Sequence, residues 1–205
     1  MVMIYKLKLY LSIIHYDRYM REHKFRYNEN ERRKILDPIA ILKLLGVTTG
    51  MTFLDIGSNN GYFSLEASKM VGPTGRIYAI DIDREALTQL EYSALENRIQ
   101  NIVTSELAAE DLKSHQFDSD IIFFGTVLHD LKDPLKALIN AKNNLVQGGK
   151  IYNLDWQKSD SSIGPPLNIR FSKQYVTDLV VEAGLKVARV QDIDTNFYLF
   201  EIVAD

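Results

Sequence analysis

Cysteine is absent from this sequence of 205 residues. Its absence excludes a disulfide framework, a cysteine nucleophile and a metal site built from thiolates. Four histidines are present, but they lack the close spacing that metal-binding histidines share, so we expect no metal site. The missing cysteines therefore exclude enzymes that depend on a cysteine nucleophile or on a metal ion bound by thiolates.

Long hydrophobic runs are also lacking. The opening stretch "MVMIYKLKLYLSIIHY" is apolar, but Lys6, Lys8, Ser12 and His15 interrupt it, and it is shorter than the roughly 20 residues of a membrane helix. It has no basic start and no small-residue cleavage site, so it does not resemble a signal peptide. We therefore expect a cytoplasmic protein without a membrane span. A homodimer through residues 1–22 and peripheral contact with a membrane surface stay open.

A large excess of one charge is missing as well. The formal net charge of −3 argues against a surface that tracks nucleic acid along its whole length. The charge is uneven, however, because residues 1–34 carry nine Lys or Arg and four acids, a net +5, which leaves −8 for the remainder. A basic arm of this kind suits an anionic substrate, a membrane surface or a partner, whereas the simpler interpretation is a solvated helix face.

From residue 37 onward, short apolar runs alternate with helical patterns. Asp37-Pro38 and Asp133-Pro134 are typical helix starts, and Gly46 is typical of a helix end. We predict strands over 51–56, 76–82, 101–107, 119–125 and 150–156, helices over 38–45, 61–72, 84–97, 134–147 and 172–185, and a closing hairpin from 186–193 and 196–203. The predicted fold class is α/β: a doubly wound, mostly parallel seven-stranded sheet with a C-terminal antiparallel hairpin and helices on both faces.

The turn "DIGSNNG", residues 55–61, follows the first predicted strand. In doubly wound sheets ligands bind beyond the carboxyl ends of the strands, so this turn is a binding site by position. Gly57 and Gly61 let the backbone approach a ligand closely. Asp55 suits a cationic ammonium or sulfonium group and would repel a pyrophosphate. The glycine spacing also differs from the G-x-G-x-x-G of dinucleotide sites, which argues against a nicotinamide dehydrogenase.

Asp81 ends the second predicted strand. An acid at this place can accept hydrogen bonds from both ribose hydroxyls of an adenosine. Hydrogen bonds to a charged group contribute roughly 1.5–3 kcal/mol each, so loss of Asp81 is expected to weaken adenosine binding tenfold or more. The alternative is a solvated strand end without a ligand.

Residues 23–205 resemble a class I S-adenosylmethionine-dependent methyltransferase, of the broad group that includes quinone-ring methyltransferases. The resemblance rests on motifs in the family's order, "FLDIGSNNGYFS", "IYAIDID", "NIVTSELAAEDL", "FDSDIIFFGTVLHDLKDP" and "LVQGGKIYNLDW". It implies S-adenosylmethionine as cofactor, with S-adenosylhomocysteine as product. It also implies in-line methyl transfer to a small, hydrophobic or aromatic acceptor. Arsenite, which some relatives methylate with the help of cysteines, is excluded here.

Carried over by position, the resemblance assigns the cofactor site. The residues implied are Asp55, Gly57, Ser58, Asn59 and Gly61 for the methionine part, Asp81 for the ribose, Ile82 with Ala109 or Glu110 for the adenine, and Gly125 for the methyl end. Two positions depart from the family pattern. Asn59 stands where the family usually has glycine, and Ala108 stands where it often has an acid that binds the adenine amino group.

On the acceptor side, His129 and Asp130 follow the fourth predicted strand and are the candidate catalytic residues. His129 suits a base because its ordinary pKa lies near neutrality. Each has a simpler alternative, since His129 can pin or pack its loop and Asp130 can cap it. The candidate substrate-binding residues are Tyr27 as part of a lid, Trp156 as a pocket wall and Arg170 as the partner of an anionic acceptor. The alternatives for Trp156 and Arg170 are a core aromatic and a surface arginine.

Two segments are predicted, a basic extension or lid over residues 1–34 and a cofactor-binding domain over residues 35–205. Residues 1–22 lie outside the family pattern, either as a docking element or because the start is Met20. Two other functions stay open. One is a protein that binds S-adenosylmethionine without turnover, and the other is an RNA-directed methyltransferase that uses the basic arm, with steep salt dependence.

Overall fold

The computed structural model describes residues 33–161 and 163–204. The chain divides into two compact units, residues 1–37 and 38–205, and the second unit holds the whole sheet. The predictions for the lid with Tyr27 and for a homodimer through residues 1–22 fall outside the described residues and stay predictions.

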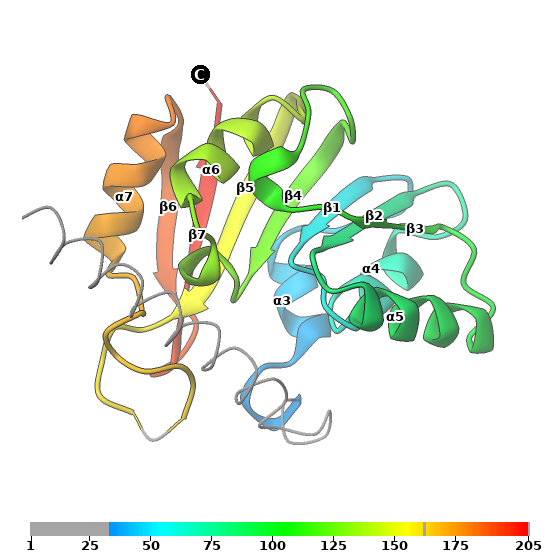
Figure 1. Ribbon diagram of the computed structural model, residues 1–205, viewed down its shortest axis with the longest axis horizontal. Helices are drawn as coiled ribbons and strands as arrows, with labels where there is room; N and C mark the ends of the chain where they lie inside the picture. Colours follow the sequence, from blue (N-terminus) through cyan, green and yellow to red (C-terminus); the bar gives the residue numbers. More distant parts are fainter. Residues whose placement is uncertain (1–32, 162, 205) are drawn as a thin grey trace, which may run out of the picture. The chain divides into compact units, whose positions relative to one another are not determined.

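A seven-stranded sheet forms the centre of the second unit, with strand order β3-β2-β1-β4-β5-β7-β6 (Figure 1). The strands are β1 (Thr52–Ile56), β2 (Arg76–Asp81), β3 (Ile102–Glu106), β4 (Ser119–Gly125), β5 (Leu145–Trp156), β6 (Lys186–Asp192) and β7 (Phe197–Val203). Neighbours among β1 to β5 pair in parallel, and β7 pairs antiparallel with both β5 and β6. The predicted fold class is confirmed.

Helices connect the strands (Figure 1). The α-helices in the described residues of the second unit are α3 (Pro38–Leu44), α4 (Ser64–Val71), α5 (Arg84–Glu96), α6 (Pro134–Lys142) and α7 (Lys173–Glu182), with short 3-10 turns at η1 (Ala109–Asp111) and η2 (Leu128–Asp130). Within the part of the chain that the structure describes, no helix is both long and apolar enough to cross a membrane.

Capping side chains explain where three of the helices begin. Asp83 accepts hydrogen bonds from the N–H groups at the start of α5, and Asp133 does the same for α6, with Pro134 at its first turn. Ser172 caps α7 by accepting from the Tyr175 N–H. Each cap satisfies a backbone donor that has no partner within its helix.

The two faces of the sheet carry different helices. Leu54 and Phe124 belong to a hydrophobic cluster with residues of α6 and α7. Phe123 points the other way, since successive strand residues alternate between faces, and it meets Phe63 just before α4 with ring centroids 4.8 Å apart. Helices α3, α4 and α5 pack as a second group on that side.

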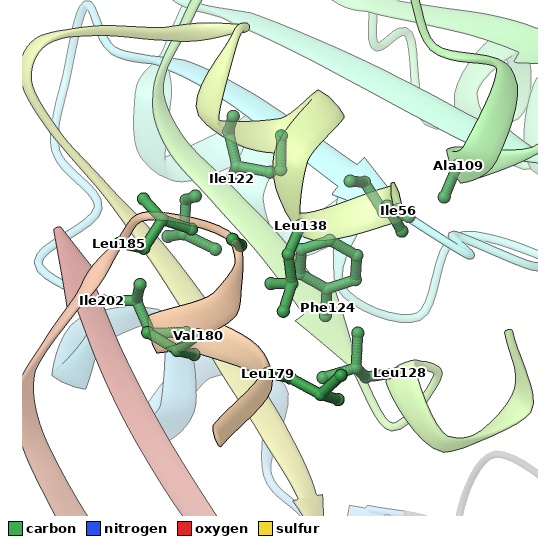
Figure 2. Packing of buried hydrophobic residues seen from close by; sticks show 14 of the residues in the cluster. Ile56, Ala109, Ile122, Phe124, Leu128, Leu138, Leu179, Val180, Leu185 and Ile202 are labelled. Atoms are coloured by element: carbon green, nitrogen blue, oxygen red, sulfur yellow. The ribbon is translucent and has the colours of Figure 1, made fainter. Parts of the chain in front are cut away.

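The cluster on the α6 and α7 face reaches the turns that follow the strands. Figure 2 shows Leu138 of α6 beside the Phe124 ring of β4, with Leu128 and Ala109 at the margin of the same cluster. Full burial of a leucine or phenylalanine side chain contributes about 2 kcal/mol. Because Leu128 and Ala109 lie in η2 and η1, this core also holds the two short turns in place.

One predicted helix is shorter than expected. The pattern predicts a helix over 134–147, but α6 ends at Lys142, and β5 begins already at Leu145. The reason is Asn144, whose fully buried side chain donates to the carbonyls of Lys113 and Asn140 and accepts from the Phe117 N–H. These bonds tie the chain to the loop before β4.

Candidate functional site

The carboxyl ends of β1, β2, β4 and β5 lie along one edge of the sheet, because neighbours among these strands run parallel. The winding reverses between β1 and β4, with β2 and β3 on one side of β1 and β4 and β5 on the other. In sheets of this kind, ligands bind in the crevice at the reversal. The turns after Ile56, Asp81, Gly125 and Trp156 therefore border one candidate site.

The turn after β1 is packed too closely for side chains at its two glycines. Gly57 has φ +71°, and a Cβ there would lie 2.4 Å from Cγ2 of Val127, in the segment after β4. A Cβ at Gly61, with φ +89°, would lie 2.3 Å from Cδ1 of Leu90 in α5. Only glycine accommodates both the backbone angle and the close approach. The turn thus presents bare backbone at these positions.

Asn59 has a conformation that explains its departure from the family pattern. Its φ is +50°, in the left-handed region where asparagine is the residue best tolerated after glycine. Its side chain Oδ1 accepts from the Asn60 N–H at 2.7 Å, which holds the turn locally. Asparagine therefore gives this backbone the shape that glycine would allow.

Asp55 and Ser58 are buried polar residues beside this turn. Asp55 is 2% exposed and accepts a hydrogen bond from the Ser64 hydroxyl at the start of α4, with the oxygens 2.6 Å apart. Ser58 is 4% exposed, and its hydroxyl has no hydrogen-bond partner among the described residues. A buried hydroxyl normally has a partner, so Ser58 is a place where a bound polar group would be satisfied.

Asp81 links two turns at the end of β2. Its Oδ2 accepts from the Asn59 N–H at 2.8 Å and its Oδ1 from the Asp83 N–H at 2.9 Å. Burial raises the pKa of Asp81, although the same N–H groups oppose the shift. Each carboxylate oxygen keeps a second lone pair, so the oriented group can still accept from a ligand. The next side chain, Ile82, is apolar and 72% exposed, which suits a flat ring.

The η1 turn places Ala109 and Glu110 differently from each other. Ala109 is buried in the hydrophobic cluster. Glu110 Oε1 accepts from the N–H groups of Lys132 and Asp133, at 3.0 and 3.2 Å, just before α6. The carboxylate that could have replaced the acid missing at Ala108 therefore holds the segment that leads into α6.

The end of β4 has an unusual backbone. A Cβ at Gly125 would lie 2.6 Å from the Phe123 ring, so only glycine fits there without a shift. Thr126 has φ +60°, which is rare for a β-branched residue, and its N–H donates to the Leu154 carbonyl at 2.7 Å. Strained positions of this kind cluster at functional sites.

His129, in η2, is buried between two carboxylates. Its Nδ1 lies 2.7 Å from Asp155 Oδ1 at the end of β5, and its Nε2 lies 3.4 Å from Asp130 Oδ1. The side chains are 3% exposed for His129, 1% for Asp155 and 22% for Asp130. Burial lowers the pKa of His129, but attraction to Asp155 and Asp130 outweighs it and raises that pKa to about 9. The ring is thus an imidazolium at neutral pH.

Trp156 and Arg170 pack together beyond β5. Trp156 is partly exposed, and the centroids of its ring and the Phe197 ring are 4.3 Å apart. The guanidinium carbon of Arg170 lies 5.7 Å from the centroid of the Trp156 ring. Arg170 is 3% exposed, so the interpretation as a surface arginine is wrong. Its guanidinium donates to the carbonyls of Gln157, Ser159, Ile163 and Pro165. Four of its five N–H groups therefore hold the loop over 157–170.

These residues fit the adenosyl sulfonium that the sequence predicts. A buried acid beside a close-packed turn suits a cation, Asp81 can accept from a ribose, Ile82 can meet an adenine, and Ser58 Oγ needs a polar partner. In the described residues there is no group of three or more His, Cys, Asp or Glu side chains that could hold a metal ion.

Comparison with known proteins agrees with this geometry. Residues 48–183 match the model of a family described as a methyltransferase domain. The chain belongs to this methyltransferase family. A solved structure, that of a SAM dependent methyltransferase from Aquifex aeolicus, superposes on it with a TM-score of 0.80 at 26% identity, over 88% of this chain and 100% of that one. The chain is accordingly an S-adenosylmethionine-dependent methyltransferase with a Rossmann-like fold.

Two further relatives have more specific names. The ubiquinone/menaquinone biosynthesis C-methyltransferase UbiE of Salmonella arizonae is 30% identical over 162 residues, which is 77% of this chain but only 61% of UbiE. The probable cobalt-precorrin-6B C(15)-methyltransferase of Sulfolobus acidocaldarius is 26% identical over 177 residues, 84% of this chain and 86% of that protein.

Sequence reasoning gave no role to Asp155. The residue ends the fifth strand in the same way as Asp55 ends the first, and the strand order brings it beside the turn after β4. The sequence does show that Asp155 is an acid near the end of the fifth strand, but only the fold shows that this side chain lies beside His129.

Proposed function

We propose that this methyltransferase acts on a small acceptor with a hydrophobic or aromatic ring. The observation that carries the proposal is the partly exposed Trp156 ring, two residues beyond Leu154, which pairs with Gly125 at the methyl end of the site. The relatives support it, because one is named for ubiquinone/menaquinone biosynthesis and the other for cobalt-precorrin-6B. Both names describe methylation at carbon.

The proposed cofactor contacts follow the geometry. The turn over 57–61 and Asp55 would hold the methionine part, Asp81 the ribose, Ile82 and the buried Ala109 the adenine, and Gly125 would leave room for the methyl end. Glu110 would act on the loop before α6, and Ser58 would donate to a polar group of the ligand. When bound, S-adenosylmethionine supplies a methyl group that is already activated. The work left to the protein is to align the acceptor and to exclude water.

On the acceptor side, we assign His129 and Asp130 to the methyl-transfer end of the site and Trp156 to its wall. Arg170 is a poor partner for an anionic acceptor, because its N–H groups already hold four carbonyls. Its role would be to shape the loop over 157–170 and to support the Trp156 ring from one side.

Calorimetric titration tests the cofactor site. Wild type should bind S-adenosylmethionine and S-adenosylhomocysteine and should not bind NAD. Asp81→Asn should weaken both affinities at least tenfold, because a charged acceptor for the ribose is lost. Asp120→Asn is the matched control, since Asp120 also accepts a backbone N–H, from Thr52 at 2.8 Å, but at the opposite edge of the sheet. Equal losses in the two variants would contradict the ribose assignment.

Formation of S-adenosylhomocysteine tests the acceptor class. Reduced naphthoquinones, phenols and indoles should be methylated, with Trp156→Ala raising KM at least tenfold and leaving cofactor affinity unchanged. Methylation of RNA with none of the ring compounds methylated would favour the RNA-directed alternative. Cofactor binding without turnover on any acceptor would favour the non-catalytic one.

A further inference from the structure

We propose that Asp155 acts through His129 to position Asp130, and that Asp130 takes a proton from the methyl acceptor. The proposal rests on the acceptor class proposed above. It also specifies the protonation state in which the acceptor binds to the site. It also divides the roles, with Asp130 as the catalytic residue and His129 and Asp155 as positioning residues.

The hydrogen-bond geometry sets the orientation of the ring. Asp155 Oδ1 accepts from the Trp156 N–H at 2.8 Å and lies 2.7 Å from His129 Nδ1. A carboxylate oxygen only accepts, so Nδ1 must carry a proton and donate it. The other ring nitrogen, Nε2, is then directed toward Asp130, 3.4 Å away. Nδ1 of His129 therefore donates to Asp155, and Nε2 lies within ion-pair distance of Asp130.

Burial decides which member of the group can meet an acceptor. The side chains of Asp155 and His129 are 1% and 3% exposed, whereas that of Asp130 is 22% exposed. A proton acceptor must come within hydrogen-bond reach of the proton it removes. Of the three side chains, that of Asp130 is exposed enough for an acceptor to contact it, whereas that of His129 is not. The prediction of His129 as the base is accordingly replaced by a role behind Asp130.

The charged residues around His129 support this division of roles between Asp130 and His129. Around His129, Asp155 on β5 and Asp130 in η2 favour the imidazolium, while Arg170, from the loop before α7, opposes it. Asp155 Oδ2 has no hydrogen-bond partner in the described part of the chain, so the imidazolium is the group that stabilises this buried charge. Tyr198, beside Asp155 in the β5–β7 register, stays neutral because burial and Asp155 raise its pKa.

Asp130 itself is suited to accept a proton. Burial raises its pKa, His129 opposes the rise and Asp155 adds to it. A carboxylate with a raised pKa is a stronger base than an exposed aspartate. As the acceptor's O–H or C–H gives its proton to Asp130, its electron pair forms the new bond to the methyl carbon. The methyl–sulfur bond of the cofactor would break in the same step, and sulfur would keep the electron pair of that broken bond as the neutral thioether.

The same charges select the acceptor. The positive charges of His129 and Arg170 oppose those of the aspartates, but Asp130 is the exposed member of the group and is therefore the charge that an acceptor meets. An acceptor that arrives as an anion would be repelled, whereas a neutral one can lose its proton in place. We therefore expect a neutral hydroxyl-bearing ring, such as a hydroquinone, methylated at oxygen or at an adjacent ring carbon, and we expect no turnover of aromatic carboxylates.

Two measurements test the proposal. Nitrogen-15 NMR of labelled histidine identifies His129 by comparison with His129→Gln, among only four histidines in the chain. Wild type should show both ring nitrogens protonated at neutral pH, and Asp155→Asn should lower the titration midpoint by at least one pH unit. A neutral ring in wild type, or an unchanged midpoint in Asp155→Asn, would overturn the proposal whatever the acceptor.

The second measurement is the pH profile of methyl transfer to reduced 1,4-naphthoquinone, with naphthalene-2-carboxylate as the anionic probe. Asp130→Asn should lower kcat about 100-fold or more with cofactor affinity unchanged. Asp155→Asn should shift the pH profile, which a purely structural residue would not do. The matched control is Asp133→Asn, which removes a carboxylate that caps α6 three residues away and should keep kcat within about twofold.

The outcomes separate this proposal from the one on which it rests. Wild type that binds S-adenosylmethionine but methylates no hydroxyl-bearing ring overturns the acceptor class. Wild type that methylates the hydroquinone while Asp130→Asn does so equally well overturns the role of Asp130 alone. Efficient methylation of the carboxylate would overturn the charge argument.

Discussion

Three aspartates at the carboxyl edge of the sheet have different partners. Asp55 accepts from a serine hydroxyl, Asp81 from two backbone N–H groups, and Asp155 pairs with His129. A buried charge is tolerated only when it is paired or hydrogen-bonded, so the partner determines what each aspartate can do. Asp81 keeps lone pairs for a ligand, whereas the charge of Asp155 is balanced inside the protein.

The pairing of His129 makes stability depend on pH. The pKa of its ring is 6.5 ordinarily and about 9 in the fold. The stabilisation is therefore fully present below pH 6.5 and is lost as the pH rises through 9. We expect the free energy of unfolding to fall by up to about 3 kcal/mol across this window, measured by urea denaturation. His129→Gln should lack this decline, and parallel curves for the two proteins would contradict the assignment.

At the scale of elements, the turn after β1 and the loop after β5 are held by opposite means. The turn keeps its shape because side chains are missing at Gly57 and Gly61. The loop over 157–170 keeps its shape because one buried side chain, that of Arg170, reaches four carbonyls. Each arrangement can be tested with a substitution that has a matched control elsewhere in the chain.

Gly57→Ala should destabilise the protein more than Gly46→Ala. Both glycines have positive φ, +71° and +77°, but a Cβ at Gly46 would meet nothing within 4 Å. The two variants share the backbone strain of about 1 kcal/mol, and Gly57→Ala adds overpacking of roughly 1–3 kcal/mol against Val127. Thermal denaturation measures the difference. Equal losses would show that the turn yields more easily than its packing suggests.

Arg170→Lys should loosen the loop over 157–170. One ammonium cannot reach all the carbonyls that the planar guanidinium joins, and unsatisfied buried carbonyls cost roughly 1–3 kcal/mol each. We expect a loss of about 3 kcal/mol and faster proteolytic cleavage within the loop. Arg84→Lys is the control, because Arg84 is exposed and its guanidinium, in the described part of the chain, pairs with Glu91 at the surface. Similar cleavage in both variants would argue against the role assigned to Arg170.

A structural feature can be predicted from the sequence when the residues that cause it lie close together in the chain. The start of α6 at Asp133-Pro134 was predicted from the sequence, because a cap acts within a few residues of its helix. The early end of α6 was missed, because the partners of Asn144 include Lys113 and Phe117, about thirty positions earlier in the chain. For the site, strand ends identify candidate residues, but which of them meet is decided by strand order.

At the scale of the whole molecule, charge separates the acceptor classes. The net charge is −3, and residues 1–34 hold a local excess of +5. We expect no binding of bulk tRNA near physiological salt, and weak binding at low salt that falls steeply between about 50 and 200 mM. A gel-shift titration over this range checks it. Tight binding that persists at the higher salt would revive the RNA-directed alternative.

Of the described strands, β7 comes last in chain order, and it lies inside the sheet between β5 and β6. Phe197, Tyr198 and Phe200 of this strand are at most 1% exposed. During synthesis β6 leaves the ribosome before β7, and among the described strands β7 is the one that pairs with β6. The nascent chain must therefore keep β6 and the flank of β5 uncovered until β7 arrives, so the completion of this core is a late event that a chaperone would be placed to protect.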